Sequence, residues 1–211
     1  MSRVSNYDKA LAGARAAFLA HDPAALAAKY PVEWDGRCLR LRFAGEPYRI
    51  DAETGAVDCP DRPGYVPGHD ELMCIWDMLC FADARPAPAG EWCPTASLAG
   101  IAGGQDASHL LTRFREAVSA APEKLEDARL ALRASRDGGA DFAMVIPAFD
   151  WFPCRFCFWQ ADDEFPAQVV FYWDRNARRF VRYETLWFMN MYLSRRIWAA
   201  VEDRDWWRGE A

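Results

Sequence analysis

Three consecutive acidic residues, Asp162, Asp163 and Glu164, carry the side chains of this sequence that are best placed for chemistry. Trp159 and Phe165 flank them and could shield the carboxylates from water. Two neighbouring carboxylates can bind a hard cation, or divide the roles of acid and base when their surroundings differ. Turns are also acidic simply because they face water, so a solvated turn remains the alternative interpretation.

Cysteine supplies the second candidate chemistry, because Cys154 and Cys157 form a CxxC pair. A structural zinc site needs four ligands, and no second CxxC or paired histidine accompanies this one. Residues i and i+3 of a strand also point to opposite faces. The sequence therefore predicts core thiols and no bound zinc or iron–sulfur cluster, with a metal site or a redox pair as the alternatives. Seven cysteines at irregular spacing indicate free thiols in a reducing compartment.

The remaining residue types limit the reactions open to this chain. It has three histidines and only three lysines, and no GxSxG, HExxH or GxxxxGK[ST] motif is present. Gly103-Gly104 precedes a predicted helix and could hold an anion on free backbone amides, although an ordinary loop is the commoner meaning of such a pair. The sequence identifies no catalytic residue and no cofactor.

The acidic residues lie between two predicted strands. Phe142 to Ile146 is apolar on both alternating faces, which indicates a central strand covered on both sides. The run from Phe165 to Asp174 has one apolar and one more polar face, as in a half-buried strand. It pairs most simply with the preceding run in an antiparallel hairpin that turns at Ala161 to Glu164. Asp174 lies at the end of this strand away from the acidic turn, so it would join the turn only if the fold brought that end back to it.

A second hairpin is predicted earlier in the chain. Leu39, Leu41 and Phe43 alternate with polar residues, and Ala44-Gly45 turns the chain back toward Ile50. Arg40 and Arg42 lie on the outer face of this hairpin. They could line an anion site, but outward arginines are more often solvated or ion-paired.

Helices are expected around these strands. The pattern of caps, apolar spacing and stop signals predicts several of them, together with a short edge strand at Phe180 to Arg182. The expected helix starts are Ser5, Asp22-Pro23, Asp70, Asp106 or Ser108, Pro122 (ending at Gly138-Gly139) and Glu184 (ending at Glu202). This order of elements predicts a single α+β domain over residues 1–211, with a mainly antiparallel sheet and several packing helices.

The central segment also carries a resemblance. A strand that ends in Ile146-Pro147, then Trp159, then Asp163 to Ala167, then an aromatic run that closes on Asp174, resembles the bacterial family known as domain of unknown function 3786. The similarity extends to Tyr7-Asp8, to Glu71 through Phe81, to Trp92 and to the Leu98 to Gly104 loop, which together span about residues 5–200. The residues that this resemblance marks as candidates for ligand binding are Trp159, Asp163, Glu164, Asp174 and Trp92. It implies no activity, but it does imply a companion role in the corrinoid and iron–sulfur metabolism of anaerobes.

Composition bounds the partners. The net charge of −6 and the lack of a basic tail disfavour general nucleic-acid binding. No run has the length and apolar character of a membrane span or a signal peptide, so we expect a cytoplasmic protein without a membrane partner. Ten Trp and 13 Phe exceed what one core needs. Trp187, Trp198 and Trp206-Trp207 therefore predict a homo-oligomer or protein-partner interface at the C-terminus.

Two functional classes follow from these observations. One is a non-catalytic accessory protein that binds a ligand or a partner. The other is a carboxylate-based, metal-dependent enzyme with Asp163 and Glu164 at its site. The absence of histidine and cysteine clusters favours the first class.

Overall fold

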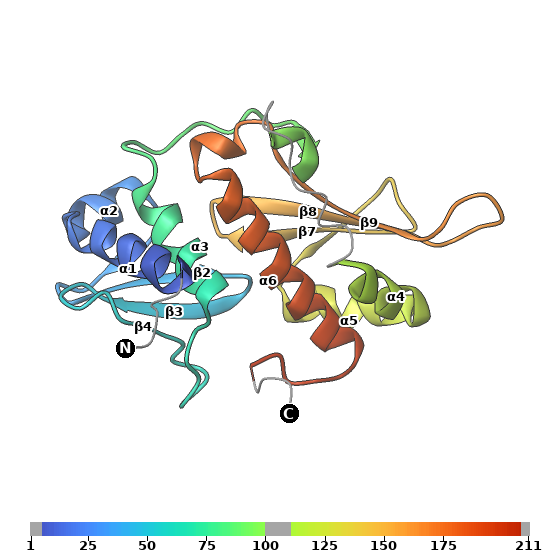
Figure 1. The fold of residues 1–211 in the computed structure, drawn as a ribbon, viewed down its shortest axis with the longest axis horizontal. Helices are drawn as coiled ribbons and strands as arrows, with labels where there is room; N and C mark the ends of the chain where they lie inside the picture. Colours follow the sequence, from blue (N-terminus) through green and yellow to red (C-terminus); the bar gives the residue numbers. More distant parts are fainter. Residues whose placement is uncertain (1–5, 100–110, 208–211) are drawn as a thin grey trace.

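A computed structural model describes residues 6–99 and 111–207 of the chain (Figure 1). In these residues, nine strands form one mainly antiparallel sheet in the order β4-β3-β2-β7-β8-β9-β5, with β1 on β2 and β6 on β7. The strands are β1 (Glu33–Trp34), β2 (Cys38–Phe43), β3 (Glu46–Asp51), β4 (Val57–Asp58), β5 (Trp92–Pro94), β6 (Ser135–Asp137), β7 (Phe142–Phe149), β8 (Phe152–Trp159) and β9 (Gln168–Asp174). The predicted α+β fold is confirmed.

Six α-helices accompany the sheet in the described residues. They are α1 (Asn6–Leu19), α2 (Pro23–Lys29), α3 (His69–Cys80), α4 (Thr112–Ala120), α5 (Leu125–Ala131) and α6 (Tyr183–Val201). Short 3-10 turns are η1 (Thr95–Leu98), η3 (Pro122–Lys124) and η4 (Ala177–Arg179). In Figure 1, α6 crosses in front of β7 and β8; α3 packs beside α6, and α1 packs on α3. None of the described helices is both long and apolar enough to cross a membrane.

The central strand and its hairpin are present, but their bounds differ from those predicted. β7 continues past Ile146 to Phe149, and β9 begins at Gln168 and not at Phe165, so the turn is longer than expected. β7 is buried along most of its length and lies between β2 and β8. β8 pairs with β9, from Trp159 opposite Gln168 to Arg155 opposite Tyr172, and residues 160–167 connect the two strands. This connection projects from the body at the right of Figure 1.

The two halves of the sheet meet where β2 pairs with β7, and this junction positions the β2–β3 hairpin relative to α6. β7 has a register shift between Ile146 and Phe149, next to Pro147. Beyond the shift, Phe149 pairs with Phe43 at the end of β2. The Phe43 ring stacks on Phe149 at 4.8 Å on one side and on Tyr192 of α6 at 4.7 Å on the other. The β2–β3 hairpin is thereby fixed against the middle of α6.

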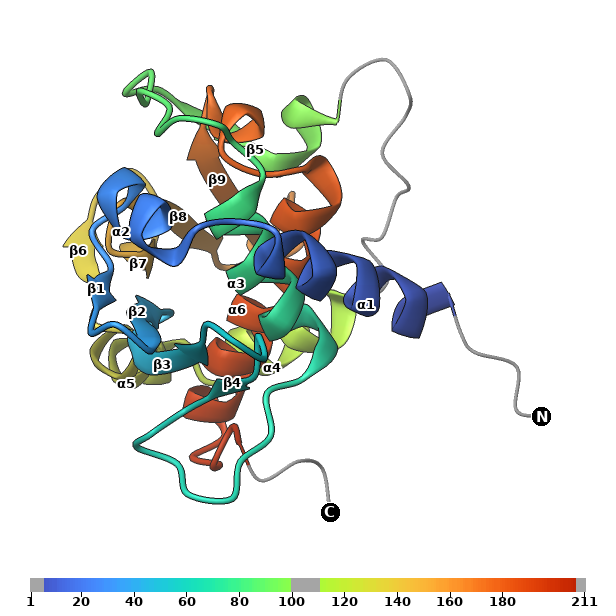
Figure 2. The same ribbon diagram turned by 90° about the vertical axis from the view of Figure 1, so that its left-hand side faces the viewer.

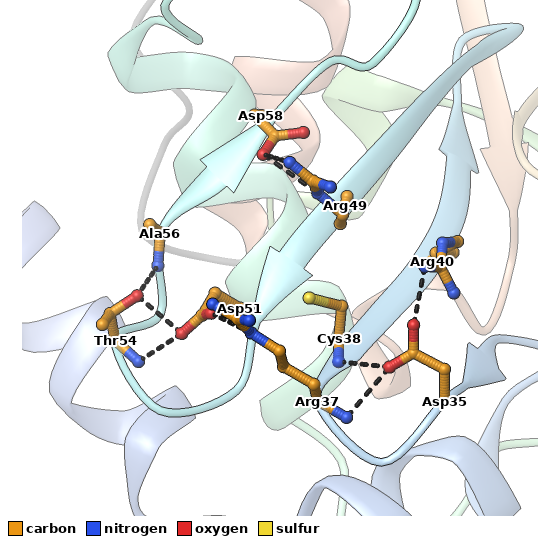
Figure 3. Close-up of polar contacts among 9 residues, drawn as sticks. All are labelled: Asp35, Arg37, Cys38, Arg40, Arg49, Asp51, Thr54, Ala56 and Asp58. Carbon is orange, nitrogen blue, oxygen red and sulfur yellow. Dashed lines mark hydrogen bonds and ion pairs between the residues drawn. The ribbon is translucent and has the colours of Figure 1, made fainter.

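The predicted β2–β3 hairpin is confirmed, with Ala44 and Gly45 both at positive φ in its turn. Its outer face carries a network of exposed ion pairs, shown in Figure 3, that we call the β2–β4 ladder. Arg40 pairs with Asp35 at 2.6 Å and Arg49 pairs with Asp58 at 2.7 Å. The ion-paired interpretation of Arg40 is therefore confirmed.

Several predicted boundaries are wrong. The cap of α3 is Gly68 and not Asp70, because the Glu71 side chain, three residues on, accepts the Gly68 amide. Phe180 to Arg182 is no strand. η4 ends just before it, at Arg179, and the amide of Arg182, which caps α6, donates to Asp77 of α3.

The helix predicted to run from Pro122 to Gly138-Gly139 is shorter than expected. It ends at Ala131, because Arg133 adopts φ +53 and the Ala134 amide bonds to the Arg129 carbonyl. The strand β6 follows, which the sequence analysis missed. The predicted start signals Ser5, Asp106 and Ser108, like Gly103-Gly104, lie outside the described residues. The other helix starts are confirmed: Asp22 caps α2 and accepts the Ala24 amide at 3.0 Å, and α6 begins one residue before Glu184.

Candidate functional site

A groove with a volume of about 890 Å³ opens between the start of α3, the C-terminal half of α6 and the loop before α3. Figure 2 shows that loop and the chain after α6 together at the bottom of the molecule. The lining residues that matter below are Tyr65, Asp70, Glu71, Tyr192, Arg195, Arg196 and Trp206. We call this groove the Glu71 cleft.

Glu71 is the carboxylate at the base of the cleft, and only 2% of the residue is exposed. It lies in the first turn of α3, where the positive helix end favours a negative charge. Its Oε1 accepts the Tyr48 hydroxyl at 2.5 Å, while its Oε2 accepts the Gly68 amide at 2.8 Å and the Tyr65 hydroxyl. Three donors thus hold the buried carboxylate, which replaces the water that it loses.

A chain of hydrogen bonds continues from Glu71 to α6. Because Tyr48 directs its proton to Glu71, the Tyr192 hydroxyl, 2.9 Å away, donates to Tyr48. Tyr192 in turn accepts Arg196 Nη1 at 3.2 Å. The two residues are four positions apart on α6 and so share one helix face. Tyr48 reaches them because the Phe43 junction fixes its hairpin against α6.

Arg196 is a buried cation, with 3% of the residue exposed. Its Nη2 lies 3.3 Å from Glu46 Oε1, and Arg62 Nη2 contacts the same oxygen at 3.1 Å. A buried charge is tolerated when it is paired and hydrogen-bonded, and both conditions hold here. Glu46 therefore carries the countercharge for two guanidinium groups.

Burial sets the protonation of the phenols in this network. Removal from water, as the largest cause, raises the pKa of Tyr48, Tyr65 and Tyr192. The nearby Glu71 charge raises the pKa of all three further. The phenols therefore stay protonated at neutral pH and act as donors, not as bases.

The rim of the cleft is more exposed than its base. Arg195 Nη2 lies 3.0 Å from Asp70 Oδ2, and 55% of the Arg195 side chain is exposed. Asp70 Oδ1 also lies 3.3 Å from His69 Nδ1. Trp206 forms a wall, with its ring edge-on to Tyr65 at 5.2 Å. The Arg196 guanidinium lies 4.2 Å from the Trp206 ring centre.

Residues 22–196 match the family model described as domain of unknown function (DUF3786). The chain belongs to this family. The predicted resemblance is confirmed, and the match includes the cleft from Tyr48 to Arg196 but not Trp206. No curated protein and no solved structure matches the chain. DUF3786 membership names no activity, so the function has to be argued from the site.

The residues that the sequence marks as candidates in this DUF3786 protein fall into two other places. Asp174 of β9 and Trp92 of β5 are cross-strand partners. The residues just before β5 lie next to this pair. Asp174 is buried and accepts the amides of Ala89 at 2.9 Å and Gly90 at 2.8 Å. The carboxylate therefore fastens the loop before β5.

Trp159, Asp163 and Glu164 lie at the opposite end of β9, so the fold does not return Asp174 to the acidic turn. Asp162 shapes that turn: its Oδ1 accepts the Glu164 amide at 2.9 Å and the Phe165 amide at 2.7 Å. These amide bonds, the Phe165 one first, lower the pKa of Asp162. Asp163 and Glu164 are exposed.

The cysteines lie in the core. Cys154 and Cys157 are buried residues of β8 whose positions alternate to opposite faces of the sheet. Burial raises the pKa of both thiols. In residues 6–99 and 111–207, no group of three or more His, Cys, Asp or Glu side chains could hold a metal ion. That the protein binds no stoichiometric zinc or iron–sulfur cluster stays a prediction, which metal analysis of the purified protein tests.

Sequence reasoning missed Tyr48, Tyr192, Arg196 and the role of Glu71. One local signal existed for Glu71, which lies three residues after a glycine that opens a helix, as the acidic residue of a capping box does. Tyr192 and Arg196 are polar groups on the buried side of α6, which is a weaker signal.

Proposed function

We propose that this protein is a non-catalytic binding protein that holds a small ligand in the Glu71 cleft. The observation that carries the proposal is an open groove of about 890 Å³ whose base is a buried, internally satisfied network. Ligand sites are typically concave and aromatic, with a few fixed polar groups. Tyr65 and Trp206 supply the aromatic surface, and Tyr192 and Arg196 supply the fixed polar base.

The state of the polar groups favours binding over catalysis. A general base needs a free lone pair within reach of the substrate, but both oxygens of Glu71 already accept hydrogen bonds. Tyr48, Tyr65 and Tyr192 have raised pKa values and keep their protons. The guanidinium of Arg196 does not deprotonate. His69 Nε2 has no hydrogen-bond partner among the described residues, but the atom is buried, so a ligand in the cleft does not reach it.

The family resemblance supports the accessory part of the proposal. It implies that the protein serves corrinoid or iron–sulfur proteins of anaerobic bacteria. The proposed cytoplasmic location comes from the sequence pattern and not from the family. In that role the cleft would hold a ligand while a separate surface contacts the served protein. Of the tryptophans expected at an interface, Trp206 and Trp207 line the cleft. Trp187 and Trp198, both partly buried on α6, remain the proposed contact or oligomer surface.

Ligand-observed NMR with a fragment library that contains neutral, cationic and anionic aromatics tests the binding function. Val66→Trp fills the mouth of the cleft, because Val66 lines it and is 81% exposed. Leu130→Trp on α5 is the matched control, since Leu130 is also exposed. We expect hits on the wild type and on Leu130→Trp that Val66→Trp loses. Hits that survive Val66→Trp, or no hits at all, would contradict the proposal.

A carboxylate-based, metal-dependent enzyme with Asp163 and Glu164 at its site is the second candidate. The observation in its favour is that neither side chain bonds to any described residue, while the neighbouring Phe165 is 59% exposed. Titration calorimetry with Mn²⁺ compares the wild type with Asp163→Ala/Glu164→Ala and with Asp150→Ala, an acid in the β7–β8 turn. Stoichiometric binding that only the double variant loses would establish this site. Unfolding free energies within about 0.5 kcal/mol of wild type would show that the acids do not hold the hairpin, and the calorimetry then decides between a ligand site and a solvated turn.

A further inference from the structure

We infer that the ligand of the Glu71 cleft is a planar, aromatic anion, whose carboxylate or phosphate binds Arg195 and whose ring packs on Trp206. This inference rests on the proposed function, because it names the class of ligand for the same cleft. Some charged groups of the cleft are already hydrogen-bonded within the protein, and others face water.

The buried charges are satisfied from within. Glu71 accepts from Tyr48, Tyr65 and the Gly68 amide. Arg196 is committed to Tyr192 and Glu46. A ligand would have to break these bonds, inside a poorly hydrated site, to use either charge. Glu71 and Arg196 therefore form the rigid floor of the cleft and make no ion pair with the ligand.

Arg195 is the charged group that can reach a ligand. More than half of its side chain is exposed, against 20% of the Asp70 side chain. Its ion pair with Asp70, through Nη2, uses one of five guanidinium donors. Within the described residues, no further hydrogen bond from this guanidinium is formed. The remaining donors form a planar fork that fits a carboxylate or a phosphate.

Asp70 does not cancel this preference for anions. It lies in the first turn of α3, where the helix dipole stabilises a negative charge. His69 Nδ1 lies 3.3 Å from Asp70 Oδ1, the oxygen that Arg195 leaves free. Asp70 therefore keeps favourable surroundings when Arg195 shares its donors with a ligand, and it offers a cationic ligand no unpaired oxygen.

The wall beside Arg195 accounts for the aromatic part of the ligand. Trp206 and Tyr65 lie edge-on at 5.2 Å, and both are only partly buried. Aromatic rings pack on such surfaces in offset or edge-to-face arrangements with a gain beyond burial alone. The Arg196 guanidinium and Tyr192 hold the Trp206 ring from inside the protein. The wall is therefore in place before a ligand arrives.

Three probes with one ring system test the inference: 2-naphthoate, 2-naphthyl phosphate and the neutral 2-naphthamide. Titration calorimetry measures each probe on the wild type, Arg195→Gln, Trp206→Ala and Arg49→Gln. Arg49 is the matched control, because it is a half-exposed arginine in an ion pair of the β2–β4 ladder. Thermal unfolding of each variant verifies that it is folded.

We expect one or both anionic probes to bind the wild type and Arg49→Gln at least about tenfold more tightly than 2-naphthamide, which corresponds to one charge-assisted contact. Arg195→Gln should lose this preference but still bind the ring, and Trp206→Ala should weaken all three probes. The tighter of the two anions identifies the headgroup as carboxylate or phosphate. Added salt should reduce the preference.

Equal affinity for 2-naphthamide, an unchanged preference in Arg195→Gln, or no binding of any probe would overturn the inference. The fragment library separates this failure from failure of the proposed function. Neutral or cationic hits that Val66→Trp abolishes would leave the cleft a binding site and reject only the anion. No hits from either experiment would reject both.

Discussion

The Glu71 cleft and the β2–β4 ladder are both dense in charged side chains, yet they differ in what water can reach. In the ladder, Arg49 and Asp58 are each about half exposed, and water screens their attraction (Figure 3). In the cleft, Glu71 and Arg196 are almost fully buried and depend on fixed neighbours. A buried polar network is costly to the fold when one member is lost, so we expect substitutions in the cleft to lower the unfolding free energy far more than substitutions in the ladder.

The largest expected effect comes from Glu71→Ala. Tyr48, Tyr65 and the Gly68 amide would lose their acceptor, and α3 would lose its capping side chain. Hydrogen bonds to a charged group are worth about 1.5–3 kcal/mol each, so we expect a loss of roughly 3 kcal/mol or more in the free energy of unfolding. Urea denaturation measures it, with the exposed Glu53→Ala as the control. A loss below about 1 kcal/mol would mean that the network does not stabilise the fold.

Tyr48→Phe should have the next largest effect. It removes one hydroxyl that donates to Glu71 and accepts from Tyr192, at nearly constant volume. We expect a loss of about 1–3 kcal/mol, as for other buried hydrogen bonds to a charged partner. Tyr172→Phe on β9 is the matched control, because no hydrogen bond of the Tyr172 hydroxyl is formed within the described residues. Equal losses in the two variants would contradict the burial argument.

Arg49→Gln tests the exposed side of the comparison. Both partners of its ion pair with Asp58 are about half exposed to water, and such pairs contribute about 0–1 kcal/mol to stability. We expect the unfolding free energy to stay within about 0.5 kcal/mol of wild type. A loss as large as that of Tyr48→Phe would show that the ladder is a structural network after all.

The smallest effect is confined to acid pH. Asp35 accepts the Cys38 and Arg37 amides and pairs with Arg40, and these contacts, the Cys38 amide first, lower its pKa from 3.8 to about 2. A depressed folded-state pKa stabilises the protein above about pH 4, and this contribution is lost as the pH falls toward 2. Asp35→Asn should therefore show a shallower loss of stability between pH 4 and 2 than wild type. Parallel curves over this range would contradict the assignment.

The sequence predicts the parts of this molecule that depend on local pattern. Alternation locates β7, the β8–β9 hairpin and the β2–β3 hairpin, and helical spacing locates α6. The ladder was also within reach, because outward arginines on a strand are visible in the alternation. The end of α5 at Ala131 was not, because the residue that stops the helix by adopting positive φ, Arg133, is not a glycine.

The site could not be predicted in the same way. Tyr48 and Tyr192 are 144 positions apart in the sequence, and they meet only because Phe43 joins the two halves of the sheet under α6. Conversely, the acidic turn stands out in the sequence because turns expose their charges. The fold places it, with Trp159, and the pair of Asp174 and Trp92 at opposite ends of β9, away from the cleft residues.

A tryptophan sits at each of the three places, and this permits the most direct test. Indole ¹H–¹⁵N spectra, assigned with single Trp→Phe variants, follow the tightest hit of the fragment library as it binds. Buried Trp173, whose Nε1 donates to Asn190 at 3.0 Å, is the internal reference. A binding site in the Glu71 cleft predicts a shift of the Trp206 signal, with Trp159, Trp92 and Trp173 unchanged. A shift of Trp159 or Trp92 with Trp206 unchanged would contradict it.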